Sequence, residues 1–382
     1  MTGGTEQRLG SVNLDPTPTC LGRRTPPLLQ RACRGNSSSR LGGRRLDLRE
    51  TNSAEARGIA DQSITMDLLN SPQQPIFGIA TSPNLAAQSV LYSSNASGAD
   101  GFQGARAHAP IAVSPNVYDK IVQYNQFSAA SYAVDCESPP FGSRILKYFD
   151  DPRTDTQAYL YRWPSANEVV LAFRGTESVR DLDTDISWQL VPLDAPGTDC
   201  TPCKVHKGFS EAYASVAQDI IQTLHNEEYC NPSASLVVTG HSLGGAIAAI
   251  AAVSLKGLGL NPTVYTYGEP RNGNPAFAHY ADAMISPERH FRVTHANDGV
   301  PQIPPKVLGY RHHGIEYWQS HDRTNGPETT FRCEGVDPEH CNAKADPGPA
   351  PINGAHLWYS DSLIANILNI EACGAKYPIK RQ

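Results

Sequence analysis

The stretch Ser235–Leu255 reads SLVVTGHSLGGAIAAIAAVSL, and it decides the fold. It opens with an apolar, β-branched run at 236–239, which predicts a short buried strand. A sharp turn follows at 240–245, and the Ala-rich run at 246–252 has high helix propensity. A strand, a G-x-S-x-G turn and a helix together are the context of a nucleophile elbow. Ser242 is therefore predicted to stand at the carboxyl edge of a sheet, beside backbone N–H groups that can hold an oxyanion.

The five-residue pattern is weak by itself, because a long, glycine-containing chain often matches it by chance. The alternative interpretation is a glycine-rich strand–helix turn with a buried serine. The flanking strand and small-residue helix favour the elbow, since both are parts that the motif requires.

Bulk composition narrows the class of protein. The chain has 382 residues, of which 40% are apolar, enough for a large core, and a net charge of −6. The negative charge argues against nucleic acid as a partner. No uninterrupted apolar run of about 18 residues occurs, so no transmembrane segment is expected.

Nine cysteines suggest an oxidising, extracellular compartment, although the N-terminus has no apolar region typical of a secretory signal peptide. Residues 1–110 are rich in Arg, Ser, Gly and Pro and lack periodicity, so a disordered extension is expected, with an Arg-rich transit-like segment as the alternative. Residues 111–382 are predicted to form the catalytic domain.

Within that domain, helical and extended patterns alternate, which indicates an α/β fold with a mostly parallel sheet. Residues 177–206 show no clear regular structure. Ser114 is a plausible N-cap for the first helix. The expected helices are 117–127, 209–225, 275–284 and 357–370, and the expected strands are 158–161, 168–173, 263–267 and 290–294.

A serine nucleophile needs a base and an orienting acid, and in α/β-hydrolases these follow it in the order acid, histidine. Asp298 directly follows the strand 290–294 and is the preferred acid; a turn-capping role in Asn-Asp-Gly is the alternative. The less favoured acids lie in polar loops with no apolar strand before them: Asp322, Asp337 and Asp346.

His356 is the preferred base because it lies in a small-residue loop that can present an imidazole to the sheet edge. His312 and His313 are expected to be packing or hydrogen-bonding groups in a strand, and His295, His321 and His340 are the remaining candidates. The oxyanion donors are expected to be the backbone N–H groups of Leu243, after the serine, and Thr176, after the strand 168–173.

These residues resemble a known family. The five motifs that carry the resemblance occur in the order seen in the fungal class 3 lipases, which include type A feruloyl esterases: Phe173-Arg-Gly-Thr176, Gly240-His-Ser-Leu-Gly244, Tyr267-Gly-Glu-Pro-Arg-Asn-Gly-Asn274, Asn297-Asp-Gly-Val-Pro301 and Ala355-His-Leu-Trp-Tyr359. The resemblance covers about residues 112–375. It implies the α/β-hydrolase fold, the triad Ser242, Asp298 and His356, and the oxyanion donors named above.

The resemblance also implies three disulfides, Cys136–Cys373, Cys200–Cys203 and Cys333–Cys341, leaving Cys20, Cys33 and Cys230 over.

By the same resemblance, the segment from 178 to about 192 would be a lid over the site. Its apolar residues Leu182, Ile186 and Trp188 would face inward. Three aspartates between 181 and 185 oppose its transfer to an apolar interface, so weak interfacial activation is predicted.

The sequence thus predicts a serine carboxylic ester hydrolase that needs no metal or organic cofactor. Its substrate would be a glyceride, met at a lipid–water interface, with a feruloylated plant polysaccharide as the alternative. The stretches Gly268–Arg271 and Gly309–Trp318 are closer to the feruloyl esterases. A non-catalytic, secreted interaction protein on a hydrolase scaffold is disfavoured, because every catalytic position can be filled.

Overall fold

The computed structural model describes residues 110–133, 135–176, 188–335, 337–349, 352–365 and 373, without the side chains of 228–230. The expected extension at 1–110 lies outside the described residues, apart from its last position, and so do Leu182 and Ile186 of the predicted lid. Among the described helices, none is long and apolar enough to cross a membrane.

A nine-stranded sheet forms the centre of the domain, in the order β1-β11-β10-β9-β8-β7-β4-β3-β2. The five neighbouring strands β10, β9, β8, β7 and β4 are parallel, and antiparallel strands flank them at both edges. The strands are β1 Ile111–Ala112, β2 Arg144–Asp151, β3 Thr156–Trp163, β4 Glu168–Phe173, β7 Ser235–His241, β8 Thr263–Tyr267, β9 His290–His295, β10 Ile315–Gln319 and β11 Thr330–Cys333.

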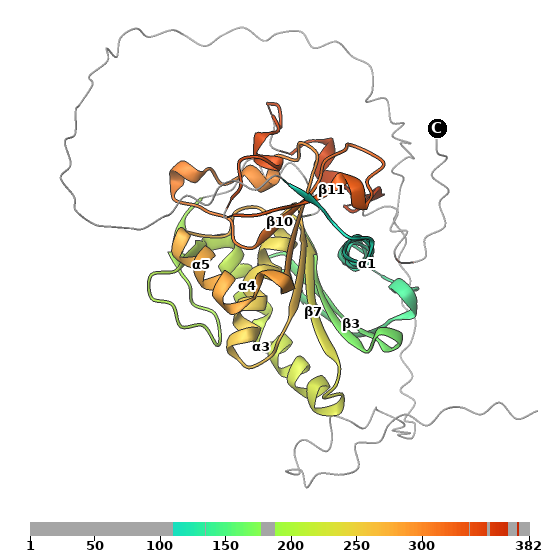
Figure 1. Cartoon of the computed structure of the whole chain (residues 1–382). Coiled ribbons are helices and arrows are strands. Elements are labelled where there is room, and N and C mark those ends of the chain that lie inside the picture. Colours follow the sequence, from blue (N-terminus) through green and yellow to red (C-terminus); the bar gives the residue numbers. More distant parts are fainter. Residues whose placement is uncertain are drawn as a thin grey trace, which may run out of the picture. The chain divides into compact units, whose positions relative to one another are not determined.

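Helices cover both faces of this sheet (Figure 1). One face carries α1, and the opposite face carries α3, α4 and α5. The α-helices are α1 Pro115–Ala130, α3 Lys207–Cys230, α4 Leu243–Gly257 and α5 Pro275–Met284. Short 3₁₀ turns are η2 Pro140–Gly142, η3 Pro164–Ala166, η4 Pro287–Arg289, η5 Val300–Gln302, η6 Lys306–Leu308, η7 Pro327–Thr329, η8 Asn342–Lys344 and η9 Gly354–Leu357. This arrangement is the α/β fold that the alternating pattern predicts.

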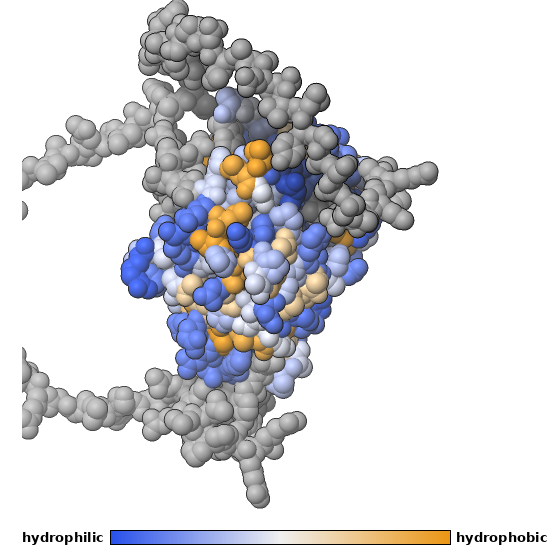
Figure 2. Space-filling view, turned by 90° about the vertical axis from the view of Figure 1, so that its left-hand side faces the viewer, coloured by the Kyte–Doolittle hydropathy of each residue, from blue (hydrophilic) through white to orange (hydrophobic). Residues whose placement is uncertain are grey.

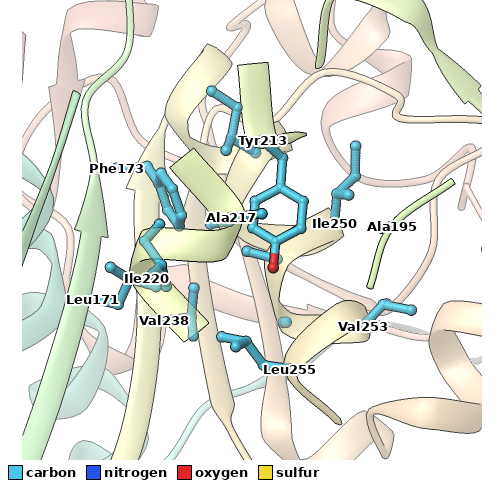
Figure 3. Packing of buried hydrophobic residues seen from close by; sticks show 14 of the residues in the cluster. Leu171, Phe173, Ala195, Tyr213, Ala217, Ile220, Val238, Ile250, Val253 and Leu255 are labelled. Carbon is cyan, nitrogen blue, oxygen red and sulfur yellow. The ribbon is translucent and has the colours of Figure 1, made fainter. Parts of the chain in front are cut away.

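The larger core lies between the sheet and the pair α3 and α4. Figure 3 shows Tyr213 and Ile220 of α3 packed among side chains of α4 and of the strands β4 and β7. The ring of Tyr213 is buried, and its hydroxyl donates a hydrogen bond of 2.9 Å to Ser254 Oγ on α4. Each fully buried apolar side chain of this size stabilises the fold by about 1.5–3 kcal/mol relative to exposure. The core therefore fixes α4, and with it the turn that precedes it.

Several sequence-based predictions are confirmed. Ser114 caps α1 through its side chain, and the expected segments 168–173, 263–267 and 275–284 coincide with β4, β8 and α5. Other elements were missed: β2, β10 and β11 in the main sheet, and a small sheet of β5 Leu190–Pro192 and β6 Lys204–His206 within the stretch 177–206.

The prediction of a helix over 357–370 is wrong where the structure describes that segment. The 3₁₀ turn η9 ends at Leu357, and β12 Trp358–Tyr359 then pairs with β13 Ser362–Leu363. Ser360 and Asp361 both have positive φ, 52° and 58°, which is the backbone of a tight two-residue hairpin turn rather than of a helix. Residues 366–370 lie outside the described part of the chain.

Candidate active site

The elbow is a single strained residue between a strand and a helix. β7 ends at His241, α4 begins at Leu243, and Ser242 has φ 57° and ψ −128°. Such a backbone is costly for a residue with a side chain and persists only where surrounding structure holds it. Neighbouring glycines make room for it: a Cβ on Gly240 would lie 2.2 Å from Gly244 O, and one on Gly244 would lie 2.3 Å from Phe173 O.

Two loops bring an imidazole and a carboxylate to Ser242. His356, in η9, has Nε2 at 2.9 Å from Ser242 Oγ and Nδ1 at 2.9 Å from Asp298 Oδ2. Asp298 follows β9, and its Oδ1 accepts a hydrogen bond of 2.9 Å from the N–H of Val300. All three side chains are buried. The structure thus brings together the three residues that the sequence predicts as a triad, in the geometry that nucleophilic catalysis requires.

Two further side chains hold His356 and Asp298 in place, and neither contact was predicted from the sequence. The hydroxyl of Tyr359 donates a hydrogen bond to Asp298 Oδ2. His241, from the elbow itself, has Nε2 at 2.8 Å from the backbone oxygen of His356. Because a carbonyl oxygen only accepts, this Nε2 carries the proton. Burial, with the nearby His356, lowers the pKa of His241 well below its usual value, so the ring stays neutral.

Tyr132, in the turn just after α1, connects the elbow to the segment before Thr176. Its hydroxyl lies 2.7 Å from His241 Nδ1, and this hydroxyl donates because Nε2 already holds the ring proton. A Cβ on Gly175 would lie 2.1 Å from the same hydroxyl oxygen, so glycine is required there. The only sequence signal for this contact was the aromatic residue near the end of the first helix, which does not reveal its partner.

The two predicted oxyanion donors lie on neighbouring segments. Leu243 is the first residue of α4, and half-buried Thr176 follows β4. The start of α4 packs against the end of β4, since a Cβ on Gly244 would come within 2.8 Å of Arg174 O. Both backbone N–H groups therefore belong to the edge of the sheet at which Ser242 lies.

Several of the alternative acids and bases have other partners. His312 Nε2 donates to Pro301 O, and His295 bonds the backbone oxygens of Ala355 and Asp322. Both His312 and His313 are buried hydrogen-bonding groups, as expected, but they precede β10 rather than lie in a strand. Asp337 forms a buried ion pair with Arg271 at 2.8 Å. Of the three residues predicted for a lid, only Trp188 lies in the described part of the chain, and it is 41% exposed.

The three disulfides implied by the resemblance are present. They join Cys136 to Cys373, Cys200 to Cys203, and Cys333 to Cys341. The first links the region after α1 to the last described residue, and it connects positions 237 apart in the sequence.

Comparison with known proteins identifies the family. Residues 170–308 match the family model described as lipase (class 3). The chain is 36% identical over 269 residues to secreted mono- and diacylglycerol lipase A of Penicillium cyclopium, which covers 65% of this chain and 86% of that protein. It is 33% identical over 258 residues to a lipase of Rhizomucor miehei, covering 63% of this chain and 68% of that protein.

A further relative is secreted mono- and diacylglycerol lipase 1 of Fusarium solani, 37% identical over 193 residues; the match spans half of this chain and 56% of that relative. Among solved structures, the Rhizomucor miehei triacylglyceride lipase superposes with a TM-score of 0.60 at 29% identity, covering 67% of this chain and 99% of that one. With this fold and these relatives, the chain belongs to the class 3 lipases, a family of carboxylic ester hydrolases.

Proposed function

We propose that the chain is a serine carboxylic ester hydrolase in which Ser242, His356 and Asp298 form the catalytic triad. The observation that carries the proposal is the unbroken series of contacts from Ser242 Oγ to His356 Nε2 and from His356 Nδ1 to Asp298 Oδ2, each 2.9 Å long. The proton on Nδ1 is donated to the carboxylate, which leaves Nε2 free to accept the serine proton.

In the first half of the reaction, Ser242 Oγ attacks the ester carbonyl and His356 Nε2 takes its proton. The oxyanion is held by the N–H groups of Leu243 and Thr176. His356 then protonates the leaving alcohol, and an acyl-enzyme remains. Water attacks this ester with His356 again as base, and release of the acid restores the serine. None of these steps uses a metal or an organic cofactor.

For the substrate we propose a glyceride. The relatives of Penicillium cyclopium and Fusarium solani are both named as mono- and diacylglycerol lipases. The described surface also carries exposed apolar side chains: Trp188 is 41%, Leu308 45% and Val307 89% exposed. Apolar residues also interrupt the hydrophilic surface on the face drawn in Figure 2. Exposed apolar surface of this kind favours contact with a lipid phase.

The feruloyl esterase alternative loses part of its support. The two stretches that resemble those enzymes contribute Glu269, Arg271 and Glu316, and all three side chains are buried and paired within the protein. Because these side chains contact other parts of the protein, their identity reflects internal packing rather than the shape of the substrate.

An extracellular location is proposed as well, because relatives are named as secreted and the domain contains three disulfides.

The test is a comparison of substrates with a matched inactive variant. The full chain and Ser242→Ala are assayed with tributyrin, triolein and methyl ferulate. We expect the wild type to cleave the glycerides faster than methyl ferulate, and the variant to lose at least about a thousandfold in kcat on every ester. Faster cleavage of methyl ferulate would favour the feruloyl esterase alternative. Equal activity of the wild type and Ser242→Ala would refute the serine mechanism.

A further inference from the structure

Outside the proposed triad, the described residues include a buried group of three side chains with metal-ligating atoms, called here the Glu269 cluster: Glu269, His290 and His313. They come from three separate segments, the loop after β8, the start of β9 and the loop before β10. Each side chain is at most 1% exposed, and the ligand atoms all lie within 4.8 Å of one another. None of the three takes part in the ester cleavage proposed above.

His290 is the unexplained member of the Glu269 cluster. It is 1% exposed, and neither Nδ1 nor Nε2 has a hydrogen-bond partner among the described residues. A buried polar atom without a partner costs about 1–3 kcal/mol, so such an atom in a folded protein calls for an explanation. A neutral imidazole is the form that binds a metal ion, and neither nitrogen of this ring is engaged by another group in the described part of the chain.

The distances within the Glu269 cluster suit one small ion. His313 Nε2 lies 2.8 Å from Glu269 Oε1, and the rings of His290 and His313 have centroids 4.5 Å apart. An ion about 2.0–2.1 Å from one nitrogen of each ring, with bonds at about 90–110°, places the ring centroids roughly 4.5–5.2 Å apart. It would place a nitrogen and a carboxylate oxygen about 3 Å apart. Small side-chain movements would therefore be enough to bring all three ligand atoms to one ion.

Neighbouring side chains hold the Glu269 carboxylate in a fixed orientation, which a metal ligand requires. Thr266 Oγ1 donates to Glu269 Oε2 at 2.5 Å, which fixes the orientation of the carboxylate. Asn272 Nδ2 lies 3.0 Å from Glu269 Oε1, and Asn272 Oδ1 has no hydrogen-bond partner within the described ranges. Half a turn of this amide would present Oδ1 as a fourth ligand. The nearby cation Arg292 has its own partner in Glu316, at 3.9 Å, so Glu269 remains to balance an ion.

From these contacts we propose that Glu269, His290 and His313 bind one divalent transition-metal ion of the zinc class, as a structural site. Two imidazoles and one carboxylate are a ligand set that Zn²⁺ accepts readily. The ion would join three segments, and one of them contains Gly268, where a Cβ would lie 2.9 Å from Asp298 Oδ2. The second described group with metal-ligating atoms, Cys333, His340 and Cys341, is different, because a disulfide occupies both thiols.

The site is enclosed, so the ion should be taken up during folding and released slowly. The full chain is therefore produced in medium with Zn²⁺ and its metal content is measured after gel filtration. We expect one Zn²⁺ per chain, and a melting temperature that falls by several degrees when a chelator removes it. Protein produced with Co²⁺ should show the visible absorption bands of a tetrahedral nitrogen–oxygen site.

Two variants separate a metal site from a packing role. His290→Phe keeps a ring against His313 but removes both nitrogens, and His313→Gln keeps a hydrogen-bond donor for Glu269. Both should fold and lose the bound metal and the cobalt bands. His279→Gln, on the exposed side of α5, is the matched control and should keep them. Less than one-tenth of an equivalent of metal in the wild type, or equal metal content in the wild type and both cluster variants, would overturn the proposal.

Discussion

The residues at the centre of the proposed site are placed by close backbone approaches. Ser242 has φ 57°, and its neighbours Gly240 and Gly244 have no room for a Cβ. Around them, side-chain hydrogen bonds orient the reacting groups: Tyr359 bonds Asp298, and His241 bonds the backbone of His356. Catalysis at such a site depends on orientation and preorganised donors, so small changes at single residues should have large effects on kcat.

Replacing Asp298 by Asn tests the acid assignment. The amide cannot accept the Nδ1 proton as a carboxylate does, so His356 is held in the wrong tautomer, and kcat should fall by about three to four orders of magnitude. The measurement is turnover of p-nitrophenyl butyrate, with circular dichroism to establish that the variant is folded. Asp322→Asn, at an exposed loop position, is the control and should keep wild-type turnover. Near wild-type activity of Asp298→Asn would contradict the assignment of Asp298 as the acid of the triad.

Replacing Gly175 by Ala tests the position of the segment that carries Thr176. The new Cβ would lie 2.1 Å from the Tyr132 hydroxyl and 2.7 Å from His241 O, so the segment must shift. Loss of one oxyanion donor costs about 10²–10³ in kcat, and a loss of that size is expected here. Gly326→Ala is the control, because the atoms nearest its Cβ belong to the end of the Glu328 side chain. An unchanged kcat for Gly175→Ala would contradict the placement.

At the scale of elements, α3 begins at an unusual cap. His206 is the N-cap, and its Nδ1 accepts a hydrogen bond of 3.1 Å from the N–H of Gly208. The ring packs against Phe209 with centroids 4.0 Å apart. Burial lowers the pKa of His206 to about 4. Only the neutral ring can accept the capping hydrogen bond, so the start of α3 depends on a group that resists protonation.

This cap predicts acid sensitivity. The pKa of His206 is lower in the folded state than the ordinary value of about 6.5, so the unfolded chain binds the proton first. Stability is then full above about pH 6.5 and falls between there and pH 4, by about 2–3 kcal/mol at pH 4.5 from this residue. Urea unfolding at pH 7 and 4.5 measures the loss. The Asn side chain of His206→Asn keeps a capping acceptor and does not titrate, so the free energy of unfolding of this variant should fall less between pH 7 and 4.5. An equal fall in the wild type and the variant would contradict the prediction.

At the scale of the whole domain, a long-range cross-link joins distant parts of the chain. Cys136 follows α1, which packs on one face of the sheet, and its partner Cys373 is 237 positions further on. In contrast, Cys200 and Cys203 are only 3 positions apart. In the chain-entropy account, a disulfide restricts the unfolded chain more strongly when it closes a longer loop.

Removing each cross-link by paired Cys→Ala substitutions tests this difference. Loss of Cys136–Cys373 should lower the free energy of unfolding by about 5 kcal/mol, against about 2 kcal/mol for Cys200–Cys203. Urea titration of the two double variants beside the wild type measures both values. A larger loss from the short loop than from the long one would show that local packing, rather than chain entropy, sets the contribution of these disulfides.

The sequence by itself determined the elements whose signals are local. A glycine-flanked serine between a β-branched run and an Ala-rich run specifies a strand, a turn and a helix, and β7 and α4 meet at Ser242 as that pattern predicts. Asp298 was found because it directly follows a strand, and His356 because it lies in a loop of small residues. In each case the deciding interactions lie within about ten residues, where periodicity and turn chemistry are informative.

Only the tertiary structure decided the contacts between distant segments. Tyr359 and Asp298 are 61 residues apart, Tyr132 and His241 are 109 apart, and His313 and Glu269 are 44 apart. No local pattern encodes such partners, because they meet only when strands from separate parts of the chain become neighbours. The hairpin after His356 has the same cause: the contact of Tyr359 with Asp298 and the tight turn at 360–361 outweigh the helical pattern of 357–370, since tertiary contacts override local propensity.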